Sequence, residues 1–225
     1  MELLAHLMST DPSSPRLTVY DESQGSRLDF SAQTLDNWTA KVGNMLLDEL
    51  DLEEGSAILL ALPVGWQAAA IALGALAAGV ETRFDDRAST DGDGEEVDVV
   101  FTSVERAAEF ADLDGADLVL VTDDPFGRGV TETGGELPAG AIDFGPTVRF
   151  YGDQFPHPTP ALTEIVATDL GPERLLTTGW TDRAGFSRQV LEPLAAGGST
   201  VIVAGLVDSA RLDEIASAEK VTKRL

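Results

Sequence analysis

Short runs of apolar residues alternate along the chain with stretches in which apolar residues recur every three or four positions. This alternation of strand-like and helix-like patterns predicts an α/β fold. The apolar runs are continuous, as in AILLAL (57–62) and STVIVA (199–204), which indicates strands buried on both faces of a parallel sheet. We therefore predict a mostly parallel sheet flanked by helices.

The same patterns place the individual elements. Strands are predicted at residues 17–20, 27–30, 57–62, 80–84, 97–101, 117–121, 175–178 and 199–204. Helices are predicted at residues 2–8, 66–78, 103–110, 162–167, 182–195 and 208–217, with one more beginning at Ser31. Ser31 and Asp208 are expected N-caps. The first two strands are expected to form a hairpin that turns at Gln24-Gly25.

Residues 123–160 are rich in Gly, Pro and Thr and are predicted to be the least regular part of the chain. They leave two alternatives for the domain organisation. Either residues 1–225 form one α/β domain, or they form two subdomains divided within residues 123–173. One continuous sheet fits the sequence as well as a division does.

The charge of the chain narrows the classes of partner. Asp and Glu number 39 against 15 Lys and Arg, which gives a net charge of −24. A field of this sign opposes the approach of DNA, RNA and anionic membranes, so we expect neither a nucleic-acid nor a membrane partner. A protein, a small ligand or a second copy of the chain remains.

The composition also limits the compartment and the chemistry. Cysteine is absent, which excludes disulfides, thiolate catalysis and cysteine metal ligands. The longest apolar stretch, residues 68–80, is shorter than the roughly 20 residues that span a bilayer. The N-terminal residues carry Glu2 and no basic segment, so they do not resemble a secretory signal. A cytoplasmic protein is expected.

Four stretches carry a resemblance to a known family. They are LDFSAQTLDNWTAKVGNMLLDELDLEEGSAILLALPVG (28–65), AAIALGALAAGVETRFDD (69–86), VLEPLAAGGSTVIVAG (190–205) and LVDSARLDEIASAEKVT (206–222). The first stretch is similar to a helix L-x-x-x-A/G-N-x-L followed by a strand that ends in L-P, and the second is similar to L-x-A-G-x-x-x-x-P-x-D. The third is similar to P-L-x-x-G-G-x-x-V-L, and the fourth is similar to a helix that ends in E-K-V-T. These motifs follow one another in the N-terminal part of the acyl-adenylate-forming (AMP-binding, acyl-CoA synthetase-like) superfamily. A small actinobacterial family shares the same distant similarity.

The chain departs from this superfamily where adenylation takes place. The family's phosphate loop, T-S-G-T-T-G-x-P-K, lies between the second and third stretches and holds ATP through amides, hydroxyls and a lysine. Residues 153–174 are poor in glycine and contain no lysine. The Y-G-x-T-E segment, the ribose-binding aspartate and the C-terminal lid domain find no counterpart before Leu225. The resemblance thus implies the fold of the N-terminal subdomains and a degenerate, non-catalytic member.

The segment RLLTTGWTDRAG (174–185) has the outline of a phosphate loop, but its residue types oppose that function. Phosphate loops need several glycines for close backbone approach, and Gly179 stands alone among residues 177–182. Trp180 is bulky where a phosphate would approach, and Asp182 would repel it.

Two arginines, Arg183 and Arg188, follow this segment, whereas no lysine does. We interpret residues 174–180 as a core strand and its exit turn, the connection left when a phosphate loop was deleted. A buried Trp180 or Phe186 at the nucleotide crevice would support this interpretation.

Other catalytic patterns are incomplete as well. His6 and His157 are the two histidines, and no serine lies in a G-x-S-x-G motif. His157 lies between two prolines and is expected in an exposed loop, and His6 is expected at the surface or at an interface. Zinc would need carboxylates from several elements beside them.

The acidic tract DDRASTDGDGEEVD (85–98) sets Asp91, Asp93 and Glu95 at alternate positions, as in an EF-hand. The places of the EF-hand glycine and final glutamate hold Glu96 and Thr102, so we interpret the tract as a solvated loop. No G-x-G-x-x-G follows a strand either. We accordingly assign no catalytic, cofactor-binding or metal-binding residue and expect no cofactor.

Three functions stay open on this basis. The first is a degenerate adenylate-family domain that binds a partner or a small ligand. The second is residual binding of AMP, ATP or CoA at the carboxyl ends of the strands. The third is an oligomeric scaffold module, suggested by the alanine-rich helix. We favour the first.

Overall fold

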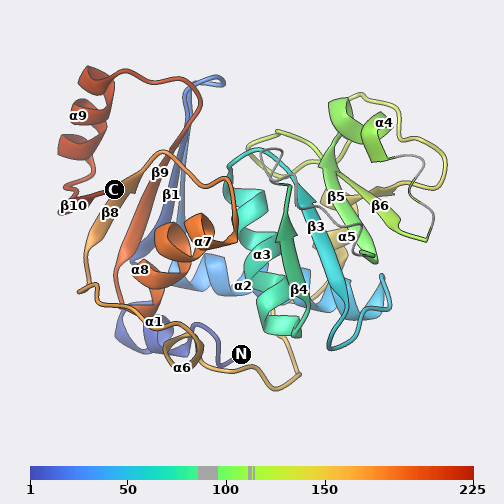
Figure 1. Cartoon of the computed structure of the whole chain (residues 1–225), viewed down its shortest axis with the longest axis horizontal. Coiled ribbons are helices and arrows are strands. Elements are labelled where there is room, and N and C mark those ends of the chain that lie inside the picture. Colours follow the sequence, from blue (N-terminus) through green and yellow to red (C-terminus); the bar gives the residue numbers. More distant parts are fainter. Residues whose placement is uncertain (86–95, 111–112, 114) are drawn as a thin grey trace. The chain divides into compact units, whose positions relative to one another are not determined.

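The computed structural model describes residues 1–85, 96–110, 113 and 115–225, and these form two compact units (Figure 1). The first unit comprises Met1–Asn37, Val64–Ala69 and Pro158–Leu225, and the second comprises Trp38–Pro63 and Ala70–His157. Each unit contains a five-stranded sheet, and nearly all strand pairs are parallel. The predicted α/β class, with mostly parallel strands flanked by helices, is confirmed.

The elements of the first unit are α1 (Ala5–Thr10), β1 (Pro15–Asp21), β2 (Ser26–Ser31), α6 (Leu162–Ile165), β8 (Arg174–Thr177), α7 (Arg183–Phe186), the π-helical turn η2 (Ser187–Leu191), α8 (Glu192–Ala195), β9 (Ser199–Ala204), α9 (Ser209–Ala218) and β10 (Lys223–Arg224). The second unit contains β3 (Ala57–Ala61), β4 (Glu81–Phe84), β5 (Val99–Ser103), the short helix η1 (Val104–Arg106), α4 (Ala107–Phe110), β6 (Asp117–Val121), β7 (Ile142–Asp143) and α5 (Phe144–Phe150). Helices α2 (Ala32–Asp48) and α3 (Trp66–Ala78) give residues to both units. None of the helices described is long and apolar enough to cross a membrane.

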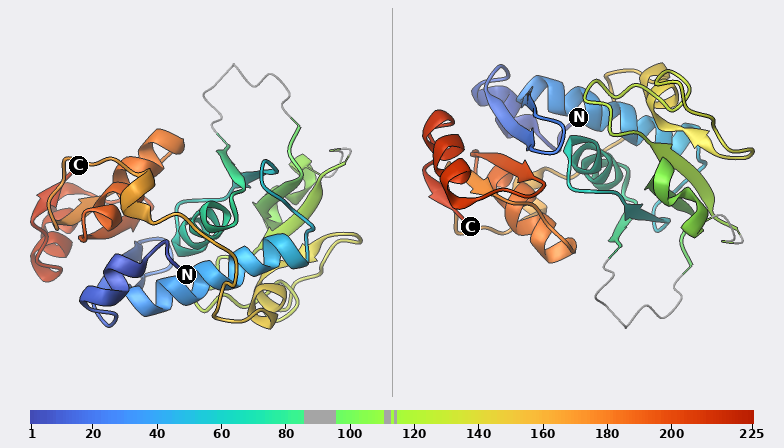
Figure 2. Two further views of the ribbon diagram at one scale, coloured as in Figure 1. Left: turned by 90° about the horizontal axis from the view of Figure 1, so that it is seen from below. Right: turned by 90° about the horizontal axis from the view of Figure 1, so that it is seen from above.

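The sheet of the first unit has the strand order β10-β8-β9-β1-β2. Only the β1–β2 hairpin is antiparallel, and Leu17 of β1 and Leu175 of β8 both pair with Thr200 in the central strand β9. Alternate residues of β8 and β9 point to opposite faces. Leu176 and Val201 pack beneath α9, whereas the side chain of Thr177 reaches η2 on the other face. Figure 2 shows α9 apart from the α7–α8 helix, with β8 and β9 between them.

The sheet of the second unit has the order β4-β3-β5-β6-β7 and is parallel throughout. Strands β3 and β5 are buried along most of their length, as their continuous apolar runs predict, whereas the edge strand β4 has no buried residue. Phe101 of β5 meets Phe144 of α5 edge to face at 6.2 Å between ring centroids. The alternative of one continuous sheet is therefore wrong for the part of the chain that the structure describes.

Most predicted elements are present, several at the predicted bounds. Helix 66–78 and the strands at 117–121 and 199–204 match α3, β6 and β9 residue for residue. The expected caps are made, because the backbone N–H of Thr34 donates to Ser31 Oγ at 3.1 Å and that of Arg211 donates to Asp208 Oδ1 at 2.8 Å. The hairpin turns at Gly25, whose φ of 62° suits glycine.

Residues 123–160 are the least regular stretch, as predicted, but the sequence did not predict the two elements in it, β7 and α5. Pro146 fits in α5 because it lies in the first turn, where its missing N–H costs nothing. The predicted helix 182–195 widens into the π-helical turn η2. Pro193 cannot donate to the carbonyl four residues earlier, and a wide turn just before it accommodates the ring. The predicted helix at 2–8 lies instead at 5–10, and β10 was not predicted.

Candidate functional site

The β8–α7 connection lies at a topological switch point of the first sheet. The chain passes from β8 through α7 and α8 to β9 in one direction across the sheet, and from β9 through α9 to β10 in the other direction. Right-handed crossovers that run in opposite directions lie on opposite faces of a sheet. Ligands of open α/β sheets bind outside the carboxyl ends of the strands at such a point. Residues 178–182 therefore occupy the place in the first unit where a ligand is expected.

Gly179, the residue that suggests a phosphate loop, has a packing role. Its φ is 100°, which disfavours any side chain, and a Cβ built on it would lie 2.6 Å from a methyl carbon of Val64. Its amide also has a partner, since it donates to Thr177 Oγ1 at 3.2 Å. Gly179 is thus required for contact with Val64, and its N–H is directed at the protein itself.

Two aromatic side chains that come after β8, Trp180 and Phe186, are buried. Trp180 is 7% exposed and Phe186 is 4% exposed, and their rings meet edge to face with centroids 5.0 Å apart. Both side chains are therefore packed inside the protein.

The N-terminus of the α7 helix is capped by its own carboxylate. Asp182 Oδ1 accepts from the backbone N–H of Gly185 at 2.6 Å, and the Asp182 carbonyl accepts from Phe186 N at 2.9 Å. A helix N-terminus binds an anion through these same amides. The Asp182 carboxylate therefore occupies the position that a phosphate would need.

Polar groups nevertheless remain beside this connection. Thr177, which is 3% exposed, donates from its hydroxyl to Gln189 Oε1 in η2. Arg183 and Arg188 are exposed, and among the arginines that the structure describes only these two have side chains without a hydrogen bond or ion pair. They supply local positive charge in a chain of net charge −24.

The two histidines lie in different units. His157 is exposed, as predicted, with its ring 5.1 Å from that of Phe155. His6, expected at the surface or at an interface, is half-buried, and its Nε2 lies 2.8 Å from the Leu194 carbonyl at the end of α8. Its Nδ1 is buried without a hydrogen-bond partner.

No group of three His, Asp or Glu residues is placed to hold a metal ion among the residues described. Most of the acidic tract at 85–98, including Asp91, Asp93 and Glu95, lies outside the described residues.

A strap over α2 explains one motif of the family resemblance. Lys41 Nζ donates to the Tyr151 carbonyl at 2.6 Å and pairs with Asp153 at 2.8 Å. Asn44 Nδ2 donates to the carbonyls of residues 152 and 154, and the Phe155 ring lies where a side chain at residue 43 would have to fit. The residues K-V-G-N of α2 therefore hold the strap at 151–155 and have a structural role.

Sequence reasoning missed a buried ionic network around Glu219, in the E-K-V-T motif. The Glu219 carboxylate accepts from Tyr20 Oη at 2.6 Å and from Arg27 Nε at 2.7 Å, and it forms an ion pair with Arg174. Its side chain is 7% exposed. Burial alone would raise the pKa of Glu219, but the hydrogen bonds from Arg27, Tyr20 and Arg174 outweigh it and lower this pKa to about 2. No local pattern could reveal the network, because its members lie up to 199 residues apart.

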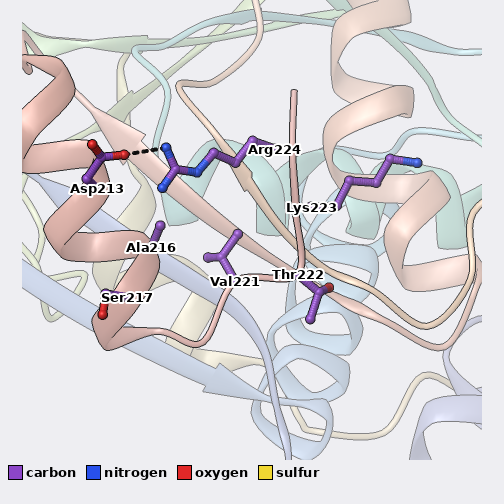
Figure 3. A pocket seen from close by; sticks show the side chains of 7 residues that line it. All are labelled: Asp213, Ala216, Ser217, Val221, Thr222, Lys223 and Arg224. Atoms are coloured by element: carbon purple, nitrogen blue, oxygen red, sulfur yellow. Dashed lines mark hydrogen bonds and ion pairs between the residues drawn. The ribbon is translucent and has the colours of Figure 1, made fainter.

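A shallow pocket of about 320 Å³ lies between α9 and β10 (Figure 3). It is lined by Asp213, Ala216, Ser217, Val221, Thr222, Lys223 and Arg224. Arg224 pairs with Asp213 at 2.6 Å, and Lys223 extends away from this pair. Val221 and Thr222 of the E-K-V-T motif belong to this lining, whereas Gly179, Trp180, Asp182 and the two histidines do not.

Comparison with known proteins adds two relationships. A scan against models of protein families finds no match. A TIGR03089 family protein of Mycobacterium tuberculosis (strain ATCC 25618 / H37Rv) is 34% identical over 246 residues, which cover 99% of this chain and 96% of that protein. Among solved structures, an acyl-CoA synthetase of Brucella canis matches with a TM-score of 0.77 and 17% identity, over 100% of this chain and 47% of that one. The predicted resemblance to acyl-CoA synthetases is confirmed at the level of the fold, and the chain spans about half the length of that synthetase.

Proposed function

The chain belongs to the TIGR03089 family, and we propose that it is a non-catalytic relative of the adenylate-forming enzymes that acts by binding a partner or a small ligand. Its fold is that of an acyl-CoA synthetase over about half of the synthetase's length. The proposal is that of a pseudoenzyme in the cytoplasm, where the architecture is kept and adenylation is lost.

The observation that carries the proposal is the buried Trp180–Phe186 pair at the carboxyl end of β8. Adenylation requires donors and positive charge directed at the phosphates of ATP. The switch point of the first unit holds other groups: two aromatic rings, the packed Gly179 and the Asp182 carboxylate. Such a surface neither admits a phosphate closely nor stabilises its charge.

The β8–α7 connection also contains no lysine that could bind a phosphate. Of the three lysines in the chain, Lys41 is bound to the strap, and Lys220 and Lys223 lie at the end of α9 and in β10. No lysine lies between residues 42 and 219. This distribution supports the loss of catalysis, because a phosphate loop places its lysine beside the amides that hold the nucleotide.

Release of pyrophosphate tests the proposal. An adenylating enzyme joins the carboxylate of its substrate to the α-phosphate of ATP and releases pyrophosphate. The purified full chain is incubated with ATP, magnesium, CoA and a panel of short, medium, long and aromatic carboxylic acids, with an active acyl-CoA synthetase as positive control. We expect no pyrophosphate above the background without protein. Acid-dependent release by the unaltered chain would overturn the proposal.

A second candidate function is residual binding of AMP, ATP or CoA without turnover. It is favoured by one observation: the two unpaired arginines, Arg183 and Arg188, follow the connection at the switch point. Ligand at about ten times its Kd would raise the melting temperature by roughly 3–6 °C. The double variant R183A/R188A should lose this shift, whereas R224A, which removes an arginine paired at the surface, should keep it. Absence of any shift at millimolar ligand would exclude this candidate.

A further inference from the structure

A buried arginine, Arg16, lies near the start of β1 and holds the turn between α8 and β9. Its Nη1 donates to the carbonyls of Gly197 at 2.7 Å and Gly198 at 3.1 Å. The two glycines belong to the stretch that resembles the P-L-x-x-G-G motif. Arg16 is 7% exposed, so most of this side chain is removed from water.

The Arg16 guanidinium forms no ion pair with a carboxylate among the residues that the structure describes. The other arginines described either form ion pairs or, like Arg183 and Arg188, are exposed to water. The Nε of Arg16 is buried and has no hydrogen-bond partner within the same described part of the chain. Burial of an uncompensated charge costs free energy, and this chain leaves one such charge unbalanced despite its 39 acidic residues.

Asp11 is the acidic residue whose charge acts on Arg16, but its carboxylate is bound to other groups. Asp11 Oδ1 accepts from the backbone N–H of Ser13 at 3.0 Å and from the Ser13 hydroxyl at 2.7 Å. Burial lowers the pKa of Arg16, and the charge of Asp11 offsets this effect only in part. The positive charge of Arg16 therefore still requires a counter-ion.

We propose that Arg16 binds a small inorganic anion of the size of chloride at Nε. A water molecule would accept the hydrogen bond of Nε but would not balance the buried charge. The guanidinium is planar with its N–H groups in fixed directions, so an anion at Nε leaves the bonds from Nη1 to Gly197 and Gly198 intact. Because Nε is buried, a large organic anion does not reach it.

The bound ion would fasten β1 to the turn before β9 and so stabilise the first unit. The net charge of −24 lowers the affinity of the chain for any anion, although salt reduces this effect because the screening length is only about 8 Å at 0.15 M. We therefore expect weak binding, with a Kd on the order of 10 mM. An ion bound only by the folded chain raises its stability by mass action.

Thermal unfolding of the full chain in two salts tests this inference. The melting temperature is compared in about 0.3 M sodium chloride and about 0.3 M sodium gluconate, whose anion is large, so that the ionic strength stays equal. For the unaltered chain we expect the melting temperature to be higher in chloride by at least about 3 °C, relative to the difference that R16Q shows between the same salts. The control R224A, which removes an exposed arginine paired with Asp213, should respond as the unaltered chain does.

A second measurement needs no variant and decides the matter if R16Q does not fold. Crystals of the unaltered chain grown in sodium bromide, whose anion replaces chloride and scatters X-rays anomalously, should show an anomalous peak beside Arg16 Nε. Absence of this peak would overturn the inference, as would an unaltered chain that responds to the two salts as R16Q does. Arg16 lies near the amino end of β1, whereas the β8–α7 connection follows the carboxyl end of β8 in the same parallel arrangement. Anion binding and pyrophosphate release are therefore independent outcomes.

Discussion

Replacement of Glu219 should change the free energy of unfolding of the first unit more clearly than surface changes. Its carboxylate joins Tyr20, Arg27 and Arg174, and thereby fixes the end of α9 to β1, β2 and β8. Replacement by glutamine keeps the size of the side chain and removes the charge. Two guanidinium groups then lose their shared counter-ion in a site where the Glu219 side chain is only 7% exposed.

The magnitude follows from the pKa of Glu219. The folded protein holds this pKa at about 2, against an ordinary value of 4.5. A difference of that size corresponds to about 3 kcal/mol of stability at neutral pH. We expect E219Q to lower the free energy of unfolding by about this amount and the melting temperature by roughly 6–12 °C.

The pH dependence provides a second readout of the same interaction. Because the folded-state pKa of Glu219 is depressed, its contribution is complete above the ordinary value of 4.5 and is lost as the pH falls towards 2. Urea unfolding of the unaltered chain and of E219Q should therefore differ most near pH 7 and converge below about pH 2.

A matched control distinguishes the network from a general effect of charge. Glu214 is another glutamate of α9, with a side chain 70% exposed, paired with Arg211 one turn away. The variant E214Q should change the stability little, because exposed ion pairs contribute little. The reasoning is refuted if E219Q is no less stable than E214Q, or if its loss of stability is the same at pH 7 and pH 3.

Three further predictions concern other parts of the chain. The variant G179A should be destabilised by about 1–3 kcal/mol in urea unfolding, since a Cβ would meet Val64 at 2.6 Å and the φ of 100° disfavours it; a stability equal to that of the unaltered chain would contradict this role of glycine. The variant N44A should lose about 1–3 kcal/mol and should make the strap at 151–155 more susceptible to proteolysis, because two carbonyls lose their donor; an unchanged cleavage pattern would argue against the strap. Burial and the hydrogen bond to Glu49 raise the pKa of Tyr151 to about 12. The variant E49Q should therefore lower the pKa of Tyr151 towards 10 in an alkaline ultraviolet titration, and an unchanged titration would count against the contact.

Periodicity identified the elements that the packing requires. Helix α3 and strands β6 and β9 lie where apolar runs place them, since α3 and β9 are buried along nearly their whole length and the last three residues of β6 are buried. Helix α5 was missed because glycine and proline are local signals of a loop, whereas here Gly145 lies against the Gly127 carbonyl and Pro146 lies in a first turn. What a glycine or proline does depends on its neighbours in space.

The candidate site was predictable in part. Residue types alone argued against a phosphate at 177–182, and the structure adds the reasons why Gly179 and Asp182 are there. The contacts of Glu219 with Tyr20 and Arg27 and the contact between Gly179 and Val64 join residues more than a hundred positions apart. Such contacts depend on the order of strands in the sheet, which a single sequence does not specify.

The strap over α2 has a practical consequence for attaching this protein to a support. Lys41 is one of three lysines, and its ammonium group is bound to the Tyr151 carbonyl and to Asp153. The other two, Lys220 and Lys223, are exposed at the end of α9 and in β10. Among the lysines, Lys220 and Lys223 should therefore react with amine-coupling reagents faster than Lys41, and attachment through them would hold the protein by one end of the first unit.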